Sequence, residues 1–278
     1  MDLTRPGQIA RLLQQYGIKV RKAWGQNFII NREIVDRIVS AAELTGTETV
    51  LEIGPGLGTM TELLLQKAGR VIAVEIDPLL CRVLRERISH PRFQLIEGDA
   101  LNQQFSSLAA GPYVVVANLP YYITSPIITK LIEEENPPQT VVVLVQLEVA
   151  QRLTAAPGTQ QYGSISAYVQ YHYDVEMLFR VGAGNFFPPP RVDSAVVRMR
   201  RQCTGQRPKN EQLLFRLIRI AFSQRRKMLK GLVAKEMGID PKQVEAALVA
   251  TGLPADVRGE KLTVTDFINL ADRLEDWA

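Results

Sequence analysis

The sequence has little cysteine and no long apolar run. Its only two cysteines, Cys81 and Cys203, lie far apart and match no metal-ligand spacing, so we expect neither a disulfide framework nor a metal site. No segment offers about 18 consecutive apolar residues, and the start of the chain lacks the uninterrupted apolar stretch of a signal peptide. These absences argue against membrane spanning and against secretion, and we expect a cytoplasmic protein.

The third glycine of a dinucleotide-binding fingerprint is also missing. The stretch EIGPGLG follows an apolar run and supplies Gly54, Gly56 and Gly58, which allow a tight turn and close approach of the backbone to a ligand. The fingerprint G-x-G-x-x-G would require glycine where the sequence has Thr59. The spacing therefore argues against NAD, and the motif viewed alone fits a plain tight turn equally well.

What the sequence does contain is ordinary globular composition, with 46% hydrophobic and 22% charged residues. Short β-branched runs alternate with helical patterns, which predicts an α/β fold with a doubly wound parallel sheet. The ligand site of such a sheet lies outside the carboxyl ends of its strands. The pattern becomes wholly helical near Cys203, so we predict a larger domain over residues 1–202 and a small helical domain over residues 203–278.

Positive charge is concentrated in one part of the chain. Positions 200–235 contain eleven Lys or Arg and a single acidic residue, although the whole chain carries only +4. Such a concentration of one sign is expected where a protein binds a polyanion. The alternative is an ordinary solvated helix face, which is the usual reason for a run of charges.

Carboxylates follow the next two predicted strands. The strand in VIAVEID ends at Glu75, which is placed to accept hydrogen bonds from ribose hydroxyls, and EGDA supplies Asp99, which is placed to accept an adenine amino hydrogen. Taken singly, such residues are more often helix caps, and Asp77 and Asp99 both precede helical patterns. Taken together they predict a ligand that carries a nucleoside but no pyrophosphate, and S-adenosylmethionine fits.

The ordered motifs resemble those of a known family. EIGPGLG, VEID, EGDA and NLPYYI are similar to successive motifs of Rossmann-like S-adenosylmethionine-dependent methyltransferases. With GQNF, LEVAQRL, YGSIS, FFPPPRVDSAVVR, AFSQRRK and GLPADVRGEKLTVTDFINLA, the set resembles the small-subunit ribosomal RNA adenine dimethyltransferases, the kasugamycin-sensitivity enzymes, from about Lys22 to Leu270. The resemblance implies methylation of N6 on two adjacent adenosines in the 3′-terminal hairpin loop of 16S rRNA, during biogenesis of the 30S subunit.

The element NLPY offers a chemical route to that reaction. Adenine N6 is a poor nucleophile because its lone pair is delocalised into the ring. We expect the Asn118 side-chain oxygen and the Leu119 carbonyl to accept its two hydrogens, which directs the developing lone pair at the sulfonium methyl. Pro120 restrains the backbone and removes a competing donor. Tyr121 is expected to stack on the base, the alternative being a packed aromatic at a strand end.

A base held in this crevice has left its own stack, so a second aromatic is expected opposite Tyr121. Similarity to the family pattern F-x-P-x-P-x-V-x-S selects Phe186 for this role and leaves Phe187 as the likelier core residue. The alternative is that Phe186 itself belongs to the core.

The resemblance also implies which residues contact the cofactor and the RNA. In GQNFIIN, Gln26, Asn27 and Ile29 would cover the methionine end of the cofactor, while Asn31 is expected to cap the following helix. The predicted cofactor contacts are Gln26, Asn27, Ile29, Gly54, Gly56, Gly58, Glu75, Asp99, Ala100 and Asn118. The predicted RNA contacts are Arg21, Lys22, Arg225, Arg226, Lys227 and Lys230.

Two alternatives of different classes stay open. One is another enzyme, either a methyltransferase of large-subunit ribosomal RNA, which shares the catalytic motifs, or a DNA adenine methyltransferase, which shares the chemistry of the Asn-Pro-Tyr element. The other is a nucleic-acid binding factor on the same fold, with a main task in ribosome assembly or transcription. Intact Glu75, Asp99, Asn118 and Tyr121 favour catalysis, and we expect a monomer that acts on 16S rRNA in a 30S precursor.

Overall fold

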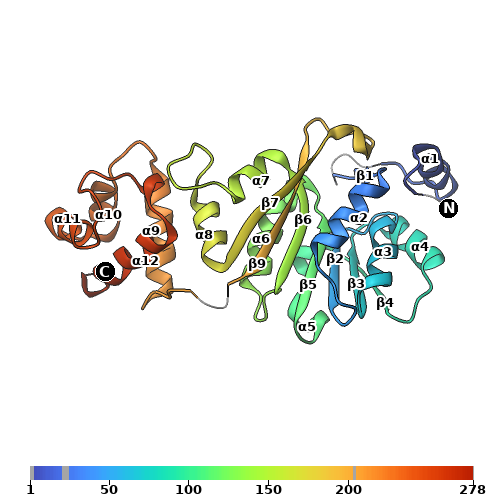
Figure 1. The fold of residues 1–278 in the computed structure, drawn as a ribbon, viewed down its shortest axis with the longest axis horizontal. Helices are drawn as coiled ribbons and strands as arrows, with labels where there is room; N and C mark the ends of the chain where they lie inside the picture. Colours follow the sequence, from blue (N-terminus) through green and yellow to red (C-terminus); the bar gives the residue numbers. More distant parts are fainter. Residues whose placement is uncertain (1–2, 21–24, 203–204, 278) are drawn as a thin grey trace. The chain divides into compact units, whose positions relative to one another are not determined.

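The computed structural model describes residues 3–20, 25–202 and 205–277. The chain divides into two compact units, one formed by residues 1–150 and 176–201 and the other by residues 151–175 and 202–278. The predicted fold class is confirmed, because the first unit is built around a seven-stranded sheet with helices and the second is helical (Figure 1).

The central sheet is mostly parallel. Its strands are β2 (Thr49–Ile53), β3 (Arg70–Glu75), β4 (Phe93–Glu97), β5 (Tyr113–Asn118), β6 (Thr140–Gln146), β7 (Tyr173–Val181) and β9 (Ser194–Arg201). They lie in the order β4-β3-β2-β5-β6-β9-β7, with β9 antiparallel to β6. The neighbouring pairs from β4 to β6 are all parallel, so their carboxyl ends meet at one edge. That edge is where the predicted site residues lie.

The central strands are buried on both faces. Side chains of β3 and β5 are almost all buried, which explains why their sequences read as continuous Val- and Ile-rich runs instead of alternating patterns. The edge strand β4 is only partly buried along its length. Burial thus follows the position of each strand in the sheet.

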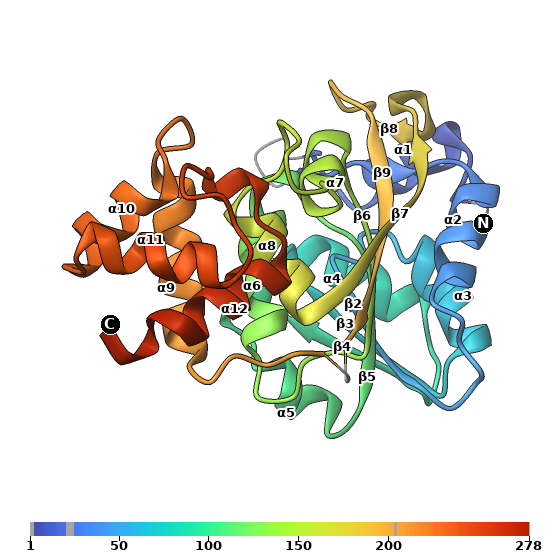
Figure 2. The same ribbon diagram turned by 60° about the vertical axis from the view of Figure 1, so that its left-hand side comes forward.

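Helices cover both faces of this sheet. The helices in this part of the chain are α1 (Pro6–Gln15), α2 (Arg32–Ala41), α3 (Thr59–Lys67), α4 (Pro78–Arg87), α5 (Phe105–Ala109), α6 (Thr124–Glu133) and α7 (Leu147–Leu153), with short 3-10 turns η2 (Ala100–Asn102), η3 (Tyr121–Ile123) and η4 (Ala183–Asn185). Figure 2 shows α2 and α3 on one side of the sheet and α5 and α6 on the other. Asn31 caps α2, as predicted, by accepting a hydrogen bond from the Ile34 amide.

A second, two-stranded sheet joins distant parts of the first unit. Strand β1 (Phe28–Ile29) pairs antiparallel with β8 (Phe186–Phe187), so that Phe28 faces Phe187 and Ile29 faces Phe186 in register. This pairing brings the segment GQNFIIN beside FFPPP. No pattern within either segment predicts it, because the two strands have only two residues each.

The second unit is a helical bundle with its own core. Its helices are α8 (Ser164–His172), α9 (Glu211–Ser223), α10 (Leu229–Met237), α11 (Pro241–Ala250) and α12 (Val264–Leu274), with turns η5 (Gly259–Lys261) and η6 (Glu275–Trp277). One cluster of buried residues, which includes Tyr162, Leu217 and Phe267, connects these helices.

This division differs from the predicted single boundary near Cys203, a residue that lies outside those described. Residues 151–175 group with the C-terminal helices because Tyr162 is fully buried among them and donates its hydroxyl to the Leu262 carbonyl at 3.0 Å. Tyr171 likewise donates to Glu211 at 2.6 Å. In sequence, α8 has the appearance of one more crossover helix of the sheet, which is why its packing was not predicted.

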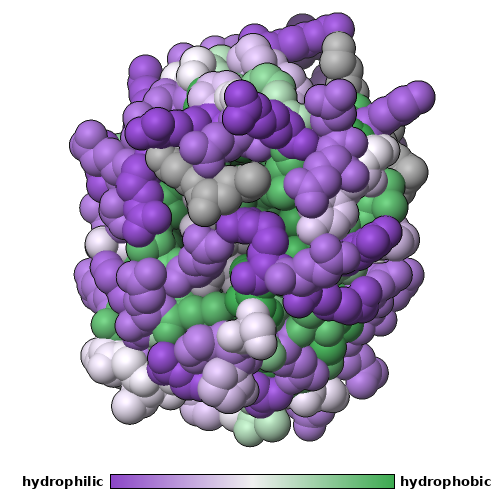
Figure 3. All heavy atoms as spheres, turned by 90° about the vertical axis from the view of Figure 1, so that its right-hand side faces the viewer, coloured by the Kyte–Doolittle hydropathy of each residue, from purple (hydrophilic) through white to green (hydrophobic). Residues whose placement is uncertain are grey.

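The face of the molecule drawn in Figure 3 is largely hydrophilic, with apolar side chains visible between the polar ones. This is the distribution expected of a protein surface that faces water. Among the described residues, no helix is long and apolar enough to cross a membrane. In the same part of the chain, no group of three or more His, Cys, Asp and Glu side chains is placed to hold a metal ion.

Candidate active site

A cavity opens at the carboxyl edge of the parallel strands. Most of the predicted cofactor residues line it, namely Gln26, Asn27, Ile29, Gly54, Gly56, Glu75, Asp99, Ala100 and Asn118, together with Pro120. They come from the ends of four adjacent strands and from the segment that contains β1. The structure therefore brings together residues that are up to 94 positions apart in sequence, and their individual roles stay predictions.

The glycine turn forms the floor of this cavity. Gly54 and Gly56 have φ angles of +68° and +59°, a region that residues with a side chain rarely adopt. A Cβ atom on Gly56 would lie 3.1 Å from the Phe28 ring, so the turn also packs tightly against β1. These two glycines allow a ligand to approach the backbone closely.

Gly58 does not line the cavity, in contrast to the other two glycines. It is the N-cap of α3 with a φ of +86°, and a Cβ atom there would come within 2.8 Å of Ile88 and 2.9 Å of Leu84. Glycine at this position leaves room for the ends of the Leu84 and Ile88 side chains and suits the positive φ angle. The cofactor contact predicted for Gly58 has no support in this geometry.

Glu75 is held rigidly at the end of β3. It is 5% exposed, and its two carboxylate oxygens accept hydrogen bonds from the backbone amides of Gly56 (3.1 Å) and Asp77 (3.0 Å). Burial raises the pKa of Glu75 to about 7 despite these two bonds. Each oxygen retains a further lone pair, which suits the predicted acceptance of ribose hydroxyls.

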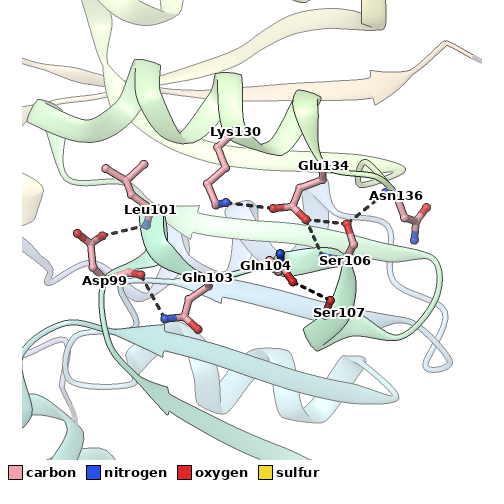
Figure 4. Close-up of polar contacts among 9 residues, drawn as sticks. All are labelled: Asp99, Leu101, Gln103, Gln104, Ser106, Ser107, Lys130, Glu134 and Asn136. Carbon is pink, nitrogen blue, oxygen red and sulfur yellow. Dashed lines mark hydrogen bonds and ion pairs between the residues drawn. The ribbon is translucent and has the colours of Figure 1, made fainter.

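The sequence left two roles open for Asp99, a helix cap or an acceptor for a ligand, and its two oxygens allow both. Its Oδ1 accepts a hydrogen bond from the Leu101 amide at 2.9 Å and so caps η2 (Figure 4). Its Oδ2 has no hydrogen-bond partner among the described residues, and Asp99 lines the cavity. Asp77 is a cap as well, since its Oδ1 accepts from the Leu79 amide at 3.0 Å. Capping thus leaves one oxygen of Asp99 for a ligand.

Glu52 is a cavity residue that the sequence analysis did not assign. It is fully buried, its Oε2 accepts a 2.6 Å hydrogen bond from the Thr61 hydroxyl, and its Oε1 has no partner among the described residues. Burial raises the pKa of Glu52 to about 8. A carboxylate inside the apolar strand VLEIG was the available signal. An unpaired acceptor in a cavity suits a cationic ligand, and S-adenosylmethionine carries both an ammonium and a sulfonium group.

The segment before β1 orients Asn118. The Asn118 Nδ2 donates a 2.9 Å hydrogen bond to the Asn27 carbonyl, which can only accept. The side-chain oxygen of Asn118 must therefore point the other way, and it has no partner within the described part of the chain. Asn27 is itself held by a 3.0 Å bond to the Gly25 carbonyl, and Gln26 donates to Asp77 at 2.9 Å. Asn118 is thus fixed with an acceptor available.

The backbone after Asn118 forms a rigid turn. Leu119 is buried and its amide donates to the Leu144 carbonyl at 3.1 Å, which continues the β5–β6 ladder. The Pro120 carbonyl accepts from the Ile123 amide and the Thr124 hydroxyl, both at 3.2 Å, so the chain enters α6 at once. This bonding explains why the strand ends at NLPY.

The two tyrosines of this turn differ in their surroundings. Tyr121 is half-buried, does not line the cavity, and shares a 2.7 Å hydrogen bond with Ser194. Tyr122 is 54% exposed and lines the cavity near Asp99, a position that the sequence analysis missed. Its neighbour Ile123 lines the cavity too.

The two phenylalanines differ in burial in the opposite sense to the one predicted, while the stacking role of Phe186 stays a prediction. Phe186 is only 2% exposed and packs in the core cluster with Ile34 and Val35, whereas Phe187 is half-buried. The register of β8 with β1 turns Phe186 toward this core, which the sequence could not show. Burial speaks against a stacking role for Phe186 in this conformation.

The predicted RNA contacts of the second unit differ in whether their cationic groups already have partners in the protein. Arg225 is bound on several sides, to Glu260 at 3.1 Å and to the Gln160 and Thr159 carbonyls at 2.9 and 3.3 Å. Arg226 and Lys227 are exposed, and their side chains have no hydrogen bond or ion pair among the described residues.

Lys230 is the remaining predicted RNA contact in the second unit, and it pairs with Glu245 at 2.7 Å. Arg21 and Lys22 lie outside the described residues.

Comparison with known families now identifies the group of methyltransferases to which these features belong. The model of a family described as "Ribosomal RNA adenine dimethylase" matches residues 17–276. This chain belongs to the ribosomal RNA adenine dimethylase family. It is therefore an S-adenosylmethionine-dependent methyltransferase. The residues predicted to contact this cofactor, apart from Gly58, line the cavity.

Curated relatives resemble the chain over nearly its whole length. "Ribosomal RNA small subunit methyltransferase A" of Pelotomaculum thermopropionicum is 40% identical, with 98% of this chain and 97% of the relative covered. The protein of the same name from Geobacillus thermodenitrificans is 39% identical with the same coverage.

Two solved structures have the same fold. A dimethyladenosine transferase from Plasmodium falciparum has a TM-score of 0.76 and 27% identity, covering 90% of this chain and 98% of that one. The 23S rRNA methyltransferase ErmE has a TM-score of 0.73 and 28% identity, covering 90% and 100%. Because these two values are nearly equal, the fold alone does not distinguish substrates on the two ribosomal subunits.

Proposed function

We propose that this protein transfers methyl groups from S-adenosylmethionine to N6 of two adjacent adenosines in the 3′-terminal hairpin loop of 16S rRNA. The observation that carries the proposal is the orientation of Asn118, whose oxygen is left available at the edge of the cavity by the bond from its nitrogen to Asn27. The small-subunit name of the curated relatives supports the choice of RNA. The protein acts as a monomer on a 30S precursor in the cytoplasm.

The chemistry requires positioning more than acid or base strength. When it is bound, the cofactor would supply an electrophilic methyl group and leave as S-adenosylhomocysteine, and the proton displaced from N6 would pass to water. Asn118 Oδ1 and the Leu119 carbonyl accept the two N6 hydrogens, which pulls the nitrogen toward tetrahedral geometry and frees its lone pair. Both acceptors belong to a turn that is fixed before substrate arrives, so little reorganisation is needed during the reaction. Tyr121 offers a ring for stacking of the extruded base.

RNA binding is assigned to the exposed basic turn between α9 and α10. Arg226 and Lys227 are the residues there with free cationic groups, and phosphate contacts of this type recognise RNA by shape and charge. Arg225 contributes by holding the turn, because its guanidinium is already engaged by Glu260 and two carbonyls.

Methyl transfer from labelled S-adenosylmethionine tests the proposal. Undermethylated 30S particles, 50S particles and adenine-containing DNA are compared, and the labelled nucleosides are identified. We expect N6,N6-dimethyladenosine from 30S particles alone. Label in 50S particles or DNA would contradict 16S rRNA as the substrate but would still support methyl transfer to adenine. Absence of transfer despite cofactor binding would instead favour the assembly-factor alternative.

A further inference from the structure

Ser194 is a buried polar residue whose hydroxyl has one described partner. It is the first residue of β9, is fully buried, and faces Gln146 across the β6–β9 ladder. Because β9 runs antiparallel to β6, Ser194 lies at the carboxyl edge where the NLPY turn is found. Its Oγ lies 2.7 Å from the Tyr121 Oη, and the two hydroxyls form a hydrogen bond. Among the described residues, the Ser194 hydroxyl has this one partner.

A buried hydroxyl is costly unless it is paired, and alanine would fill the same place in the strand without that cost. The pairing of β9 with β6 uses backbone groups only, so it does not need the serine side chain. The role left for the Ser194 hydroxyl is therefore its hydrogen bond to Tyr121.

The backbone around Ser194 is fixed on its N-terminal side. The carbonyl of Asp193 accepts a hydrogen bond from the Leu147 amide at 3.0 Å, and its Oδ1 accepts from the Ala183 amide at 3.0 Å. Asp193 is therefore engaged elsewhere, and its negative charge contributes to a raised pKa of Tyr121, for which burial is the larger cause. The phenol is kept neutral and can both donate and accept.

Tyr121 is consequently anchored at both ends. Its backbone follows Pro120, whose carbonyl accepts two hydrogen bonds, and its hydroxyl is held by Ser194. A ring that is held at its root and at its hydroxyl keeps one position and one direction of its long axis without bound RNA. Stacking of a base on such a ring loses less conformational entropy than stacking on a ring whose tip is free to swing.

We propose that Ser194 is a positioning residue that holds the Tyr121 hydroxyl and so fixes the position of the Tyr121 ring for the target adenine. This inference rests on the proposed function, in which Tyr121 stacks on the base. It adds a residue from the far strand β9 to the machinery of the NLPY turn. The hydroxyl acts through Tyr121 and has no contact of its own with the substrate.

A double-mutant cycle with Ser194→Ala and Tyr121→Phe tests the kinetic consequence. Both changes remove the same hydrogen bond and leave an aromatic ring in place, so each should lower the single-turnover rate of methyl transfer to 30S particles by about tenfold at saturating cofactor. The double variant should be no slower than either single variant. Multiplied effects in the double variant, or a normal rate in Ser194→Ala, would overturn the proposal.

A spectroscopic measurement separates this proposal from the proposed function. The protein is labelled with 3-fluorotyrosine, and its ¹⁹F resonance for Tyr121 is assigned by its disappearance in Tyr121→Phe. Ser194→Ala should shift or broaden this resonance without RNA or cofactor present. If the resonance does not move, the proposal fails whatever the substrate is. If it moves and the wild-type protein methylates no RNA, the proposed function fails and the contact stands.

Ser106→Ala is a matched control in the same unit. Ser106 also donates a short side-chain hydrogen bond, 2.6 Å to Glu134 Oε2, and Figure 4 shows it on α5 beside Glu134 and the Lys130–Glu134 ion pair. Removing this bond should lower the melting temperature while the methyl-transfer rate and the Tyr121 resonance stay unchanged. An equal effect of both serine variants on the rate would mean that Ser194 has only a stabilising role.

Discussion

At the scale of single residues, the site is organised around carboxylates buried at strand ends. Glu52 and Glu75 lie at the ends of adjacent strands with pKa values raised to about 8 and about 7 by burial. Their proximity raises the pKa of Glu52 further through charge repulsion. A cationic ligand favours the ionised form of such carboxyls, so cofactor binding and proton release are coupled.

The pH dependence of stability follows from the same two residues. Between about pH 4.5 and 8 the folded protein keeps protons that the unfolded chain has released, so the free energy of unfolding falls as pH rises. The slope for one such group is at most about 1.4 kcal/mol per pH unit. Glu52→Gln should flatten this decline, as measured by urea unfolding of the cofactor-free protein across that range. The exposed Glu33→Gln is the control, and an unchanged slope in Glu52→Gln would contradict the assignment.

Some of these residues were accessible from sequence and others were not. The place of Glu75 and Asp99 beside the cavity could be predicted, because the carboxyl ends of parallel strands meet at one edge of the sheet. In the sequence, Glu52 is one residue of the stretch EIGPGLG. The structure shows that Thr61 pairs with one of its carboxylate oxygens and leaves the other without a partner among the described residues. The burial of Phe186 and Phe187 was predicted the wrong way round. In a strand of two residues, which side chain faces the core depends on the pairing with β1, and the sequence does not show this pairing.

At the scale of elements, the turn between β2 and α3 separates ligand contact from packing. Gly54 and Gly56 face the cavity, whereas Gly58 lies beneath α3 against α4. The sequence motif cannot make this distinction, because all three glycines have the same spacing and all three have positive φ angles.

Gly58→Ala tests this separation. The new Cβ atom would overlap Leu84 and Ile88, so we expect stability to fall by about 1–3 kcal/mol. Cofactor affinity of the folded protein should stay within about twofold of wild type, as measured by calorimetry at a temperature where both are folded. Gly17→Ala is the control for backbone strain alone, since its φ is +64° and nothing lies within 4 Å of its Cβ position. Weaker cofactor binding with unchanged stability would instead support the predicted contact.

The basic turn between α9 and α10 carries a prediction of the same kind. Arg226→Gln with Lys227→Gln should reduce the salt dependence of RNA binding, with log K against log salt flattened by roughly 0.7 for each phosphate that the variant no longer neutralises. Arg225→Gln should lower the melting temperature, because it breaks the bonds to Glu260 and to two carbonyls. Filter binding at several salt concentrations measures the slope. An unchanged slope in the double variant would mean that this turn does not contact phosphate and is an ordinary solvated surface.

At the scale of the whole molecule, the order of motifs predicted the fold class and the family, and both are confirmed. The extent of the second unit was not predictable, because residues 151–175 join it through contacts to residues 40 to 100 positions further along the chain. Local periodicity identifies a helix and its apolar face, but it does not say which core covers that face. Long-range packing decided this point.

In the proposed mechanism, catalysis depends on Asn118 as the acceptor that activates adenine N6. Single-turnover methyl transfer to undermethylated 30S particles, at saturating cofactor, should be slower by about 10²–10³-fold in Asn118→Ala. Binding of the particles should be unchanged, because Asn118 belongs to the cavity and not to the basic turn. A rate within a few-fold of wild type would contradict the central claim, since the bond that orients this side chain would then serve no purpose in catalysis.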